Sequence, residues 1–213
     1  MEPIRIALAK GRIAKDGFAL LEQAGYSVSY PDKDDRRLVL EDRAGELQLI
    51  LVKSDDIPVY VEKGAADVGI VGKDVLAEAE ADVYEMMDLG FGVCRMCVAG
   101  YEPYGNRRRK LVVASKYPNV ARRYFGRMGI HAEVVKLKGS VELAPIMGLS
   151  DVIVDIVETG STLKANNLQI LETLFPVSAR LIVNKVSLKT RYQELRLLLE
   201  RLNRCMEKEE VCG

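Results

Sequence analysis

The chain alternates short apolar segments of strand type with segments of helical periodicity along most of its length. Such alternation is typical of α/β proteins, in which successive strands pair mostly in parallel. The first strand is expected at residues 4–9 (IRIALA), and a first helix over residues 16–25. Further strands are expected at 37–41, 47–52, 67–72, 93–99, 111–114, 132–136, 152–157 and 179–186. Further helices are expected at 57–64, 73–81, 118–128, 140–148 and 189–207.

The chain has 213 residues, which is enough for one large domain or two small ones. A polar turn cluster at 99–110 (AGYEPYGNRRRK) marks a weak boundary, and no Pro/Gly/Ser linker stands out. We predict a first lobe of residues 1–92 plus 180–213, onto which the last helix folds back, and a second lobe of residues 93–179. The basic run at 107–110 (RRRK) is interpreted as a solvated loop, because nothing nearby supplies backbone donors for a phosphate.

Charge and hydropathy restrict the possible partners. Lys+Arg and Asp+Glu both total 31, so the formal net charge is zero. No whole-molecule field is expected to attract nucleic acid or an anionic membrane, and an anionic ligand must be held by a local group of residues. Charges at positions 2, 5 and 10 leave no room for a signal peptide, and no apolar run approaches the length of a bilayer span. We therefore expect a cytoplasmic protein that binds neither nucleic acid nor membranes.

Two of the four cysteines, Cys94 and Cys97, form a C-x-x-C motif, which could indicate redox or metal chemistry. The sequence has no second such motif, and its single histidine is His131. The motif also lies in a segment of strand type, in which residues three apart point to opposite faces. Buried structural thiols are therefore the favoured interpretation, with a redox or metal pair as the alternative.

The segment at 151–167 (DVIVDIVETGSTLKANN) carries the strongest functional signal in the chain. It combines a strand at 152–157, a small hydroxyl-rich turn and a helix that starts near Thr162. This combination presents free backbone N–H groups, and the helix dipole favours an anion there. Gly160 allows close backbone approach to a ligand, while the neighbouring hydroxyl groups add donors. The arrangement suits a phosphate monoester.

The alternative is that the Ser and Thr side chains simply cap the helix, as they do in many loops. Two carboxylates favour the functional interpretation, because Asp155 interrupts the apolar strand and Glu158 ends it. A carboxylate in a strand made of Val and Ile is costly unless it is paired or functional. Two acids beside a phosphate-binding turn suit a ribose phosphate. The turn would hold the 5-phosphate, and the acids would accept hydrogen bonds from the ribose hydroxyls.

In the common phosphoribosyltransferases a similar element ends in T-G-x-T, but here Asp155 is followed by Ile156 and not by a second acid. The segment instead resembles the phosphoribosyl-pyrophosphate loop of the ATP phosphoribosyltransferase family. Three stretches resemble signatures of the same family: ALAKGRI (7–13), DIPVYVEKGAADVGIVGKDVL (56–76) and KLKGSVELAPIMGLSDVIVDIVETGSTLKANNL (136–168). The resemblance covers most of the chain.

The resemblance implies an α/β, two-lobed fold like that of periplasmic binding proteins (type II), with mostly parallel sheets and an active-site cleft between the lobes. It implies a pentosyltransferase that moves a phosphoribosyl group from phosphoribosyl pyrophosphate to N1 of ATP adenine in the first step of histidine biosynthesis. The products would be phosphoribosyl-ATP and pyrophosphate, with Mg²⁺ as the expected cofactor. Because no histidine-binding domain follows the last helix, the chain resembles the short form. That form works as a homodimer within a hetero-oligomer, with a regulatory subunit similar to histidyl-tRNA synthetase.

The resemblance also implies roles for individual residues, none of which is assigned to the metal. Those that bind phosphoribosyl pyrophosphate would be Asp155, Glu158, Thr159, Gly160, Ser161 and Thr162. Those on the ATP side would be Lys10, Gly11, Lys53, Gly72, Lys73, Asp74 and Asp88. Arg12 and Arg36 would act in catalysis by steadying the departing pyrophosphate, with Arg37 as the alternative to Arg36. Arg95 is a weaker candidate, and Lys53 departs from the arginine of many members, which leaves its part in phosphate geometry open.

Three other classes of protein are alternatives to this family. A solute-binding module of the periplasmic type shares the expected fold, but it would be exported and would not need the acids and turn at 155–162. A regulatory effector domain would need a DNA-binding helix-turn-helix or a basic patch, and neither precedes the expected cleft. A phosphoribosyltransferase that uses a different base is the remaining alternative, and exchanging ATP for free purines or orotate would separate the two.

Overall fold

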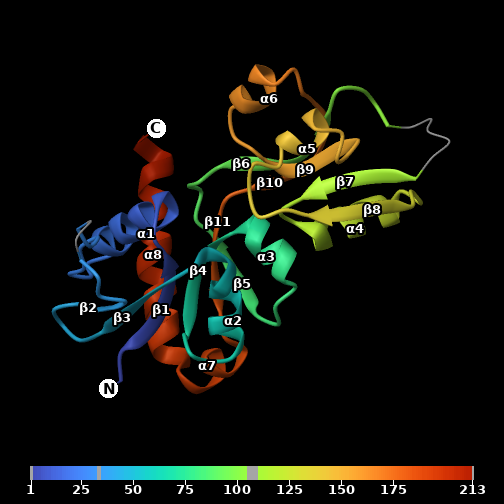
Figure 1. The fold of residues 1–213 in the computed structure, drawn as a ribbon. Coiled ribbons are helices and arrows are strands. Elements are labelled where there is room, and N and C mark those ends of the chain that lie inside the picture. The colour runs from blue at the N-terminus through green and yellow to red at the C-terminus, as the bar shows by residue number, and fades with distance from the viewer. Residues whose placement is uncertain (1, 33–34, 105–109, 213) are drawn as a thin grey trace. The chain divides into compact units, whose positions relative to one another are not determined.

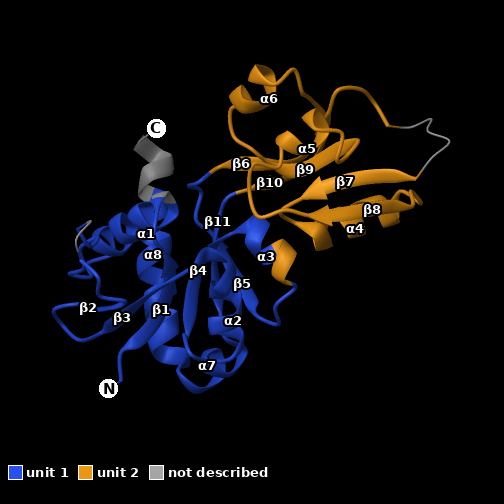
Figure 2. Ribbon diagram, in the orientation of Figure 1, with its two compact units in different colours: residues 1–76, 80–92, 178–213 blue, residues 77–79, 93–177 orange. Residues whose placement is uncertain are grey.

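The computed structural model describes residues 2–32, 35–104 and 110–212, with the backbone alone at Arg12 and at 208–212. The basic run at 107–110 therefore lies, apart from Lys110, outside the described residues. The chain divides into two compact units (Figure 2). Unit 1 contains residues 1–76, 80–92 and 178–213, and unit 2 contains residues 77–79 and 93–177.

Unit 1 is built on a six-stranded sheet with the strand order β2-β3-β1-β4-β11-β5 (Figure 1). Its strands are β1 (Ile4–Ala9), β2 (Val39–Glu41), β3 (Leu47–Val52), β4 (Val68–Gly72), β5 (Tyr84–Asp88) and β11 (Ala179–Val183). β1 pairs in parallel with β3 and β4, whereas the pairings of β2, β11 and β5 are antiparallel. Its helices are α1 (Arg12–Gln23), the short 3-10 helix η1 (Ser54–Asp56), α2 (Ile57–Glu62), α7 (Lys185–Thr190) and α8 (Tyr192–Cys212). α3 (Lys73–Ala79) begins in unit 1, and its residues 77–79 belong to unit 2.

The alternation of β1 determines which helices cover each face of this sheet. Ile6 and Leu8 join a core that includes α1 and α8, whereas Ala7 joins a second core that includes α2. The C-terminal helix lies against α1 and buries Leu195, Leu198 and Leu202 completely in the first of these cores. Leu197 is 47% exposed, so the leucines of α8 exceed what its buried face uses.

Unit 2 is built on a five-stranded sheet with the order β10-β6-β9-β7-β8 (Figure 1). Its strands are β6 (Cys94–Gly100), β7 (Leu111–Ser115), β8 (Ala132–Lys136), β9 (Val152–Val157) and β10 (Gln169–Val177). Its helices are α4 (Pro118–Arg127), α5 (Leu143–Ile146) and α6 (Ser161–Ala165). β7 pairs in parallel with β8 and β9, while β6 pairs antiparallel with β9 and β10.

The α/β class is confirmed, but both sheets are mixed, so parallel pairing is less dominant than the sequence predicted. The predicted strand at 179–186 ends at Val183, because the side chain of Asn184 caps a new helix. Its Oδ1 accepts the N–H groups of Val186 at 2.9 Å and Ser187 at 2.8 Å. The single helix predicted at 189–207 is therefore two helices, α7 and α8.

Strands β5 and β10 were not predicted, and the helix predicted at 140–148 is reduced to the four residues of α5. In the described ranges, no helix combines the length and apolarity that a membrane span requires.

Candidate active site

In unit 2, β9 leads through a tight turn into α6, as the hydroxyl-rich motif predicts. Gly160 has φ +76° and ψ 9°, a left-handed conformation that side chains disfavour, and it stands directly before the helix. The side chains of Thr159, Ser161 and Thr162 are exposed. Thr159 Oγ1 lies 3.0 Å from Ser161 Oγ and accepts the Ser161 N–H at 3.3 Å. The turn therefore presents hydroxyl groups to solvent from a fixed backbone.

The turn can attract an anion through its free backbone N–H groups more than through the dipole of the helix. Within α6 the Lys164 N–H donates to Gly160 O at 3.0 Å, so the N–H groups before it precede the hydrogen-bond ladder of the helix. With only five residues, α6 aligns few peptide dipoles. The helix dipole at this point is therefore weaker than the sequence predicted, while the turn itself is present.

The two carboxylates that precede the turn differ in their surroundings. Val152, Ile153 and Val154 are buried, but Asp155 is half-buried and Glu158 is exposed. Asp155 Oδ1 accepts the N–H of Ile156 at 2.8 Å. The strand thus reaches the surface at Asp155, and its carboxylate costs less desolvation than a fully buried one would.

Arg95 on β6 lies opposite Val157 in the antiparallel pair with β9, directly beside the residue that precedes the turn at 158–162. It is exposed. The sheet therefore brings a cation close to the carboxyl end of β9, where the two acids lie.

In unit 1, the predicted ligand residues follow the carboxyl ends of three parallel strands. Ala9 of β1 is paired with Val52 of β3, so Lys10 and Lys53 leave the sheet side by side. Both lysines line an open pocket of about 580 Å³. The remaining lining residues are Ala9, Leu38, Leu51, Val52, Ser54 and Asp55. Two cations beside an apolar wall suit a ligand that has both an anionic and an apolar part.

Gly11 has φ +130°, and its N–H donates to the hydroxyl of Tyr30 at 3.1 Å. α1 begins at the next residue, Arg12, whose side chain lies outside the described part of the structure. The strained backbone at Gly11 therefore turns the chain from β1 directly into the helix.

The two candidate arginines at 36 and 37 have different surroundings. Arg37 holds Asp35 through Nη2 at 2.7 Å and Nε at 3.1 Å. These hydrogen bonds lower the pKa of Asp35 to about 2. Arg36 is exposed and makes no hydrogen bond or ion pair with the residues that the structure describes. Of the two, Arg36 is the cation that a ligand can engage without breaking an ion pair.

The third strand, β4, leads into α3 through Gly72, Lys73 and Asp74. Asp74 is buried, and its Oδ1 would lie only 2.2 Å from a Cβ atom placed on Gly72, so a side chain at position 72 would displace the Asp74 carboxylate. Lys73 Nζ lies 2.5 Å from Glu85 Oε2. The register of β1 with β4 places these residues at the same sheet edge as Lys10.

Asp88 at the end of β5 is already engaged by neighbouring groups. It accepts the Ser178 hydroxyl at 2.7 Å and the Gly90 N–H at 3.1 Å, and Arg180 Nη2 lies 2.8 Å from its Oδ2. Partial burial alone would raise its pKa, but these donors and the cation lower the pKa of Asp88 below its ordinary value. Its carboxylate is therefore ionised and held in place.

Sequence reasoning missed Glu85 and Arg180, which connect Lys73 to Asp88. Arg180 Nη1 lies 3.5 Å from Glu85 Oε1. The signal that could have found Arg180 is the one that marked Asp155: a charged residue inside an otherwise apolar strand, here ARLIV.

The C-x-x-C motif behaves as structural thiols. Cys94 packs against one core of unit 2 and buried Cys97 against the other, on opposite faces of β6. Burial raises the pKa of the Cys97 thiol above its ordinary value, which disfavours the reactive thiolate. Within the described residues, no three His, Cys, Asp or Glu side chains cluster in a way that could hold a metal ion.

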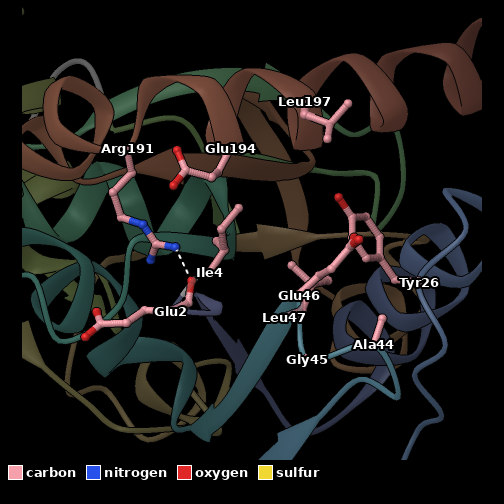
Figure 3. Close-up of a pocket in the computed structure, with 10 residues that line it drawn as sticks. All are labelled: Glu2, Ile4, Tyr26, Ala44, Gly45, Glu46, Leu47, Arg191, Glu194 and Leu197. Atoms are coloured by element: carbon pink, nitrogen blue, oxygen red, sulfur yellow. Dashed lines mark hydrogen bonds between the residues drawn. The ribbon is translucent and has the colours of Figure 1, made fainter.

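A second pocket, of about 270 Å³, lies at the opposite edge of the unit 1 sheet, beside Ile4 and Leu47, the first residues of β1 and β3 (Figure 3). Three carboxylates, those of Glu2, Glu46 and Glu194, border it. Its arginine, Arg191, donates to the backbone oxygen of Glu2 at 2.5 Å. The acidic rim does not suit a phosphate ligand, and no predicted ligand residue lines this pocket.

Comparison with known proteins connects these features to one family. The model of the family described as "HisG: ATP phosphoribosyltransferase" matches residues 53–204. The chain belongs to the ATP phosphoribosyltransferase family. It therefore catalyses the first step of histidine biosynthesis, as the sequence predicted, and it is a pentosyltransferase.

Relatives agree over the full length. The ATP phosphoribosyltransferase of Listeria monocytogenes serotype 4a is 46% identical over 99% of this chain and 100% of the relative. That of Thermoanaerobacter sp. is 50% identical over 97% of this chain and 98% of the relative.

Solved structures confirm the fold. A chain of the ATP phosphoribosyl transferase (HisG:HisZ) complex from Thermotoga maritima superimposes with a TM-score of 0.83 and 36% identity, covering 97% of this chain and 98% of that chain. The alkanesulfonate-binding protein SsuA from Xanthomonas axonopodis pv. citri superimposes with a TM-score of 0.58 at 13% identity, covering 99% of this chain and 76% of that one. The second likeness shows the fold alone and confirms the periplasmic-binding-protein-like architecture.

Proposed function

We propose that the turn at 158–162 binds phosphoribosyl pyrophosphate. The observation that carries the proposal is the left-handed Gly160, which holds a run of exposed hydroxyls and backbone N–H groups directly after two carboxylates. Thr159, Ser161 and Thr162 would donate to the 5-phosphate. Asp155 and Glu158 would accept hydrogen bonds from the ribose hydroxyls.

Unit 1 is proposed to hold ATP at the carboxyl ends of β1, β3 and β4. Lys10 and Lys53 line the same pocket, whose apolar wall suits the adenine ring and whose cations suit the phosphates. Gly11 and Gly72 would allow close approach of the backbone, and Lys73 and Asp74 would lie along the nucleotide. Asp88 would act through Arg180, because its oxygens already have partners.

The reaction breaks the bond between the anomeric carbon and the pyrophosphate, while N1 of adenine attacks that carbon. Positive charge develops on the sugar and negative charge on the leaving group, so cations placed at the pyrophosphate stabilise the transition state more than the ground state. Arg12 and Arg36 are proposed for this role. N1 of adenine carries no proton, so the chain needs no general base for its attack.

We propose Mg²⁺ as the cofactor, which when bound would supply positive charge to the pyrophosphate. Mg²⁺ is usually bound through one or two carboxylates together with substrate phosphates. Asp155 and Glu158 supply carboxylate oxygens beside the proposed phosphate-binding turn. These acids would hold the ribose and orient the metal-bearing substrate.

We further propose a cytoplasmic location and a hetero-oligomer in which a homodimer of this chain meets a regulatory subunit similar to histidyl-tRNA synthetase. The support is the likeness to a chain solved within a HisG:HisZ complex, which covers nearly the whole of both chains. Leu197 on α8 is exposed and does not pack in the core of unit 1, so its apolar side chain is accessible to another subunit.

A titration with phosphoribosyl pyrophosphate tests the assignment of the turn. Thr162→Val removes a hydroxyl from the turn, whereas Thr190→Val removes one from an exposed site at the end of α7 that no proposal involves. A hydrogen bond to a charged group contributes about 1.5–3 kcal/mol, so Thr162→Val is expected to weaken binding roughly 10- to 150-fold. Thr190→Val is expected to leave affinity unchanged. Equal affinities for both variants would mean that the Thr162 hydroxyl does not bind the 5-phosphate.

A further inference from the structure

Lys73 is fixed at both its backbone and its side chain. Its N–H donates to the Ser178 backbone oxygen at 2.9 Å, and its Nζ lies 2.5 Å from Glu85 Oε2. The Lys73 side chain is nevertheless 32% exposed, so an anion in solvent can reach it. Any anion that binds Lys73 has to compete with the Glu85 carboxylate.

Glu85 is shared unequally between two cations. Its Oε2 is in close contact with Lys73, whereas its Oε1 lies 3.5 Å from Arg180 Nη1. The second distance is longer than the 2.7–3.2 Å of an ordinary N–H···O hydrogen bond. The Glu85–Arg180 pair is thus within the range of an ion pair, but it can still tighten.

Arg180 is held in position and has donor capacity left. Its Nη2 lies 2.8 Å from Asp88 Oδ2, while the Ser178 hydroxyl and the Gly90 N–H hold the other oxygen of Asp88. The antiparallel register of β11 with β5 sets Arg180 opposite Asp88. The buried Nε of Arg180 has no hydrogen-bond partner within the described residues. A guanidinium presents five donors, so Arg180 can bind a second carboxylate without releasing Asp88.

We propose that Glu85 and Arg180 are positioning residues that exchange an ion pair when ATP binds. Glu85 orients Lys73 before the nucleotide arrives, and Arg180 takes over the Glu85 carboxylate when Lys73 turns to the polyphosphate. Asp88 keeps Arg180 in place throughout. This inference rests on the proposed assignment of Lys73 to ATP, and it deepens that assignment by naming the residues that make Lys73 available.

The exchange solves an electrostatic problem at this sheet edge. If Lys73 left Glu85 for a phosphate and no other cation were near, an unpaired carboxylate would face a polyphosphate of the same charge. Arg180 reduces this penalty, because the Glu85 carboxylate keeps a cationic partner when Lys73 leaves it. The four charges of Lys73, Glu85, Arg180 and Asp88 sum to zero before ATP binds, and after the exchange Arg180 alone holds the two carboxylates, so these three groups carry a net charge of −1.

A double-mutant cycle on ATP affinity tests the exchange, using calorimetric titration of the full-length chain with ATP. The four proteins are the wild type, Arg180→Gln, Glu85→Gln and the double variant. With Glu85 present, Arg180→Gln is expected to weaken ATP binding roughly 2- to 5-fold, the upper part of the range of an exposed ion pair. In the Glu85→Gln background the same change is expected to alter affinity by less than about two-fold, because no carboxylate needs a new partner.

An equal loss in both backgrounds would overturn the exchange, since it would mean that Arg180 contacts ATP directly or only supports the fold. An unchanged affinity in Arg180→Gln would overturn it as well. Arg180→Lys keeps a cation beside Glu85 and is expected to recover most of the affinity, which keeps the test decisive if Arg180→Gln folds poorly. Lys73→Ala distinguishes a failure of the ATP assignment from a failure of the ion-pair exchange. If Lys73→Ala leaves ATP affinity unchanged, the assignment of Lys73 to ATP is wrong. If Lys73→Ala weakens ATP binding but the double-mutant cycle is additive, only the exchange is contradicted.

Discussion

The two units present their ligand groups by different means. In unit 2 the groups are contiguous in the sequence, from Asp155 to Thr162, and the backbone of one turn fixes them around Gly160. In unit 1 the groups come from three separate segments, which follow β1, β3 and β4 and meet only because these strands are parallel neighbours. Their chemistry also differs, since unit 1 relies on the charged side chains of Lys10, Lys53 and Lys73.

This difference shows which interactions each region can lose. A backbone turn depends on one glycine conformation, so a single change of backbone preference should disable it. A group of side-chain cations depends on charge, so it should tolerate changes that keep the charge and lose affinity in steps when charges are removed. Three sets of variants test the ligand groups of the two units, beginning with the largest expected effect. A fourth variant tests the stability of unit 1.

Variants at Arg36 and Arg37 compare an arginine without an ion-pair partner among the described residues with one that is paired with Asp35. Arg36→Ala is expected to lower turnover on the order of 10²-fold, the typical effect of removing one group that stabilises developing negative charge. Arg37→Ala is the matched control, because Arg37 is paired with Asp35, and it should retain most of the activity. Steady-state rates with both substrates saturating provide the measurement. If Arg37→Ala is the slower variant, the leaving-group role belongs to Arg37.

Gly160→Val tests whether the turn of unit 2 acts through its backbone. Position 160 has φ +76°, and Gly129 of the same unit has φ +70° with open space around it, so both valine variants should be strained to a similar degree. Affinity for phosphoribosyl pyrophosphate should fall at least roughly 10- to 150-fold in Gly160→Val, the effect of losing one hydrogen bond to the phosphate. Gly129→Val should lose thermal stability without losing that affinity. A similar loss of affinity in both variants would mean that strain alone, and not the position, lowers binding.

Lys53 tests whether unit 1 depends on charge more than on exact geometry. Lys53→Ala should weaken ATP binding roughly 2- to 5-fold, while Lys53→Arg should preserve it, because the cation is retained. Lys63→Ala is the control, because Lys63 is an exposed lysine of the same unit that pairs with its neighbour Glu62. Titration with ATP at two salt concentrations measures the effect. If Lys53→Arg binds as weakly as Lys53→Ala, the pocket requires the lysine itself.

Asp67 provides the smallest expected effect and concerns stability only. It is 1% exposed at the other edge of the unit 1 sheet, where it accepts hydrogen bonds from Arg5, Ser187 and Arg191. Burial alone would raise its pKa, but these partners lower the pKa of Asp67 below its ordinary value.

A lowered pKa in the folded state means that the Asp67 network stabilises the protein above the ordinary pKa near 4 and loses that contribution as the pH falls below it. The free energy of unfolding should therefore decline below about pH 4, and Asp67→Asn should flatten part of that decline. Denaturant titrations between about pH 3 and pH 6 measure this. An unchanged slope in Asp67→Asn would show that Asp67 is not the group responsible.

Most of the fold was predictable because local signals agree with it. The alternation of IRIALA and the run LQLILV predicted β1 and β3 with their observed bounds. β5 and β10 were missed because the exposed residues of YEMMD and the polar positions of QILETLFPV give neither strand a clear apolar pattern. Their pairing with β11 and β6 is what makes them strands, and that is a tertiary effect.

The two proposed binding sites also differ in how far the sequence alone predicts them. The turn at 158–162 could be predicted because its residues adjoin one another and its glycine marks the backbone. By contrast, nothing in the sequence connects Lys73 with Glu85, or Asp88 with Arg180, because these pairs form only when β5 and β11 come together in the sheet. The network that positions Lys73 therefore required the structure.

Product formation tests the central claim most directly. Pyrophosphate release is measured with ATP and phosphoribosyl pyrophosphate together, and with each alone, in the presence of Mg²⁺ and the regulatory partner. Release is expected only when both substrates are present, with phosphoribosyl-ATP formed in equal amount. Release from phosphoribosyl pyrophosphate with orotate or a free purine in place of ATP, or no release with both substrates, would contradict it.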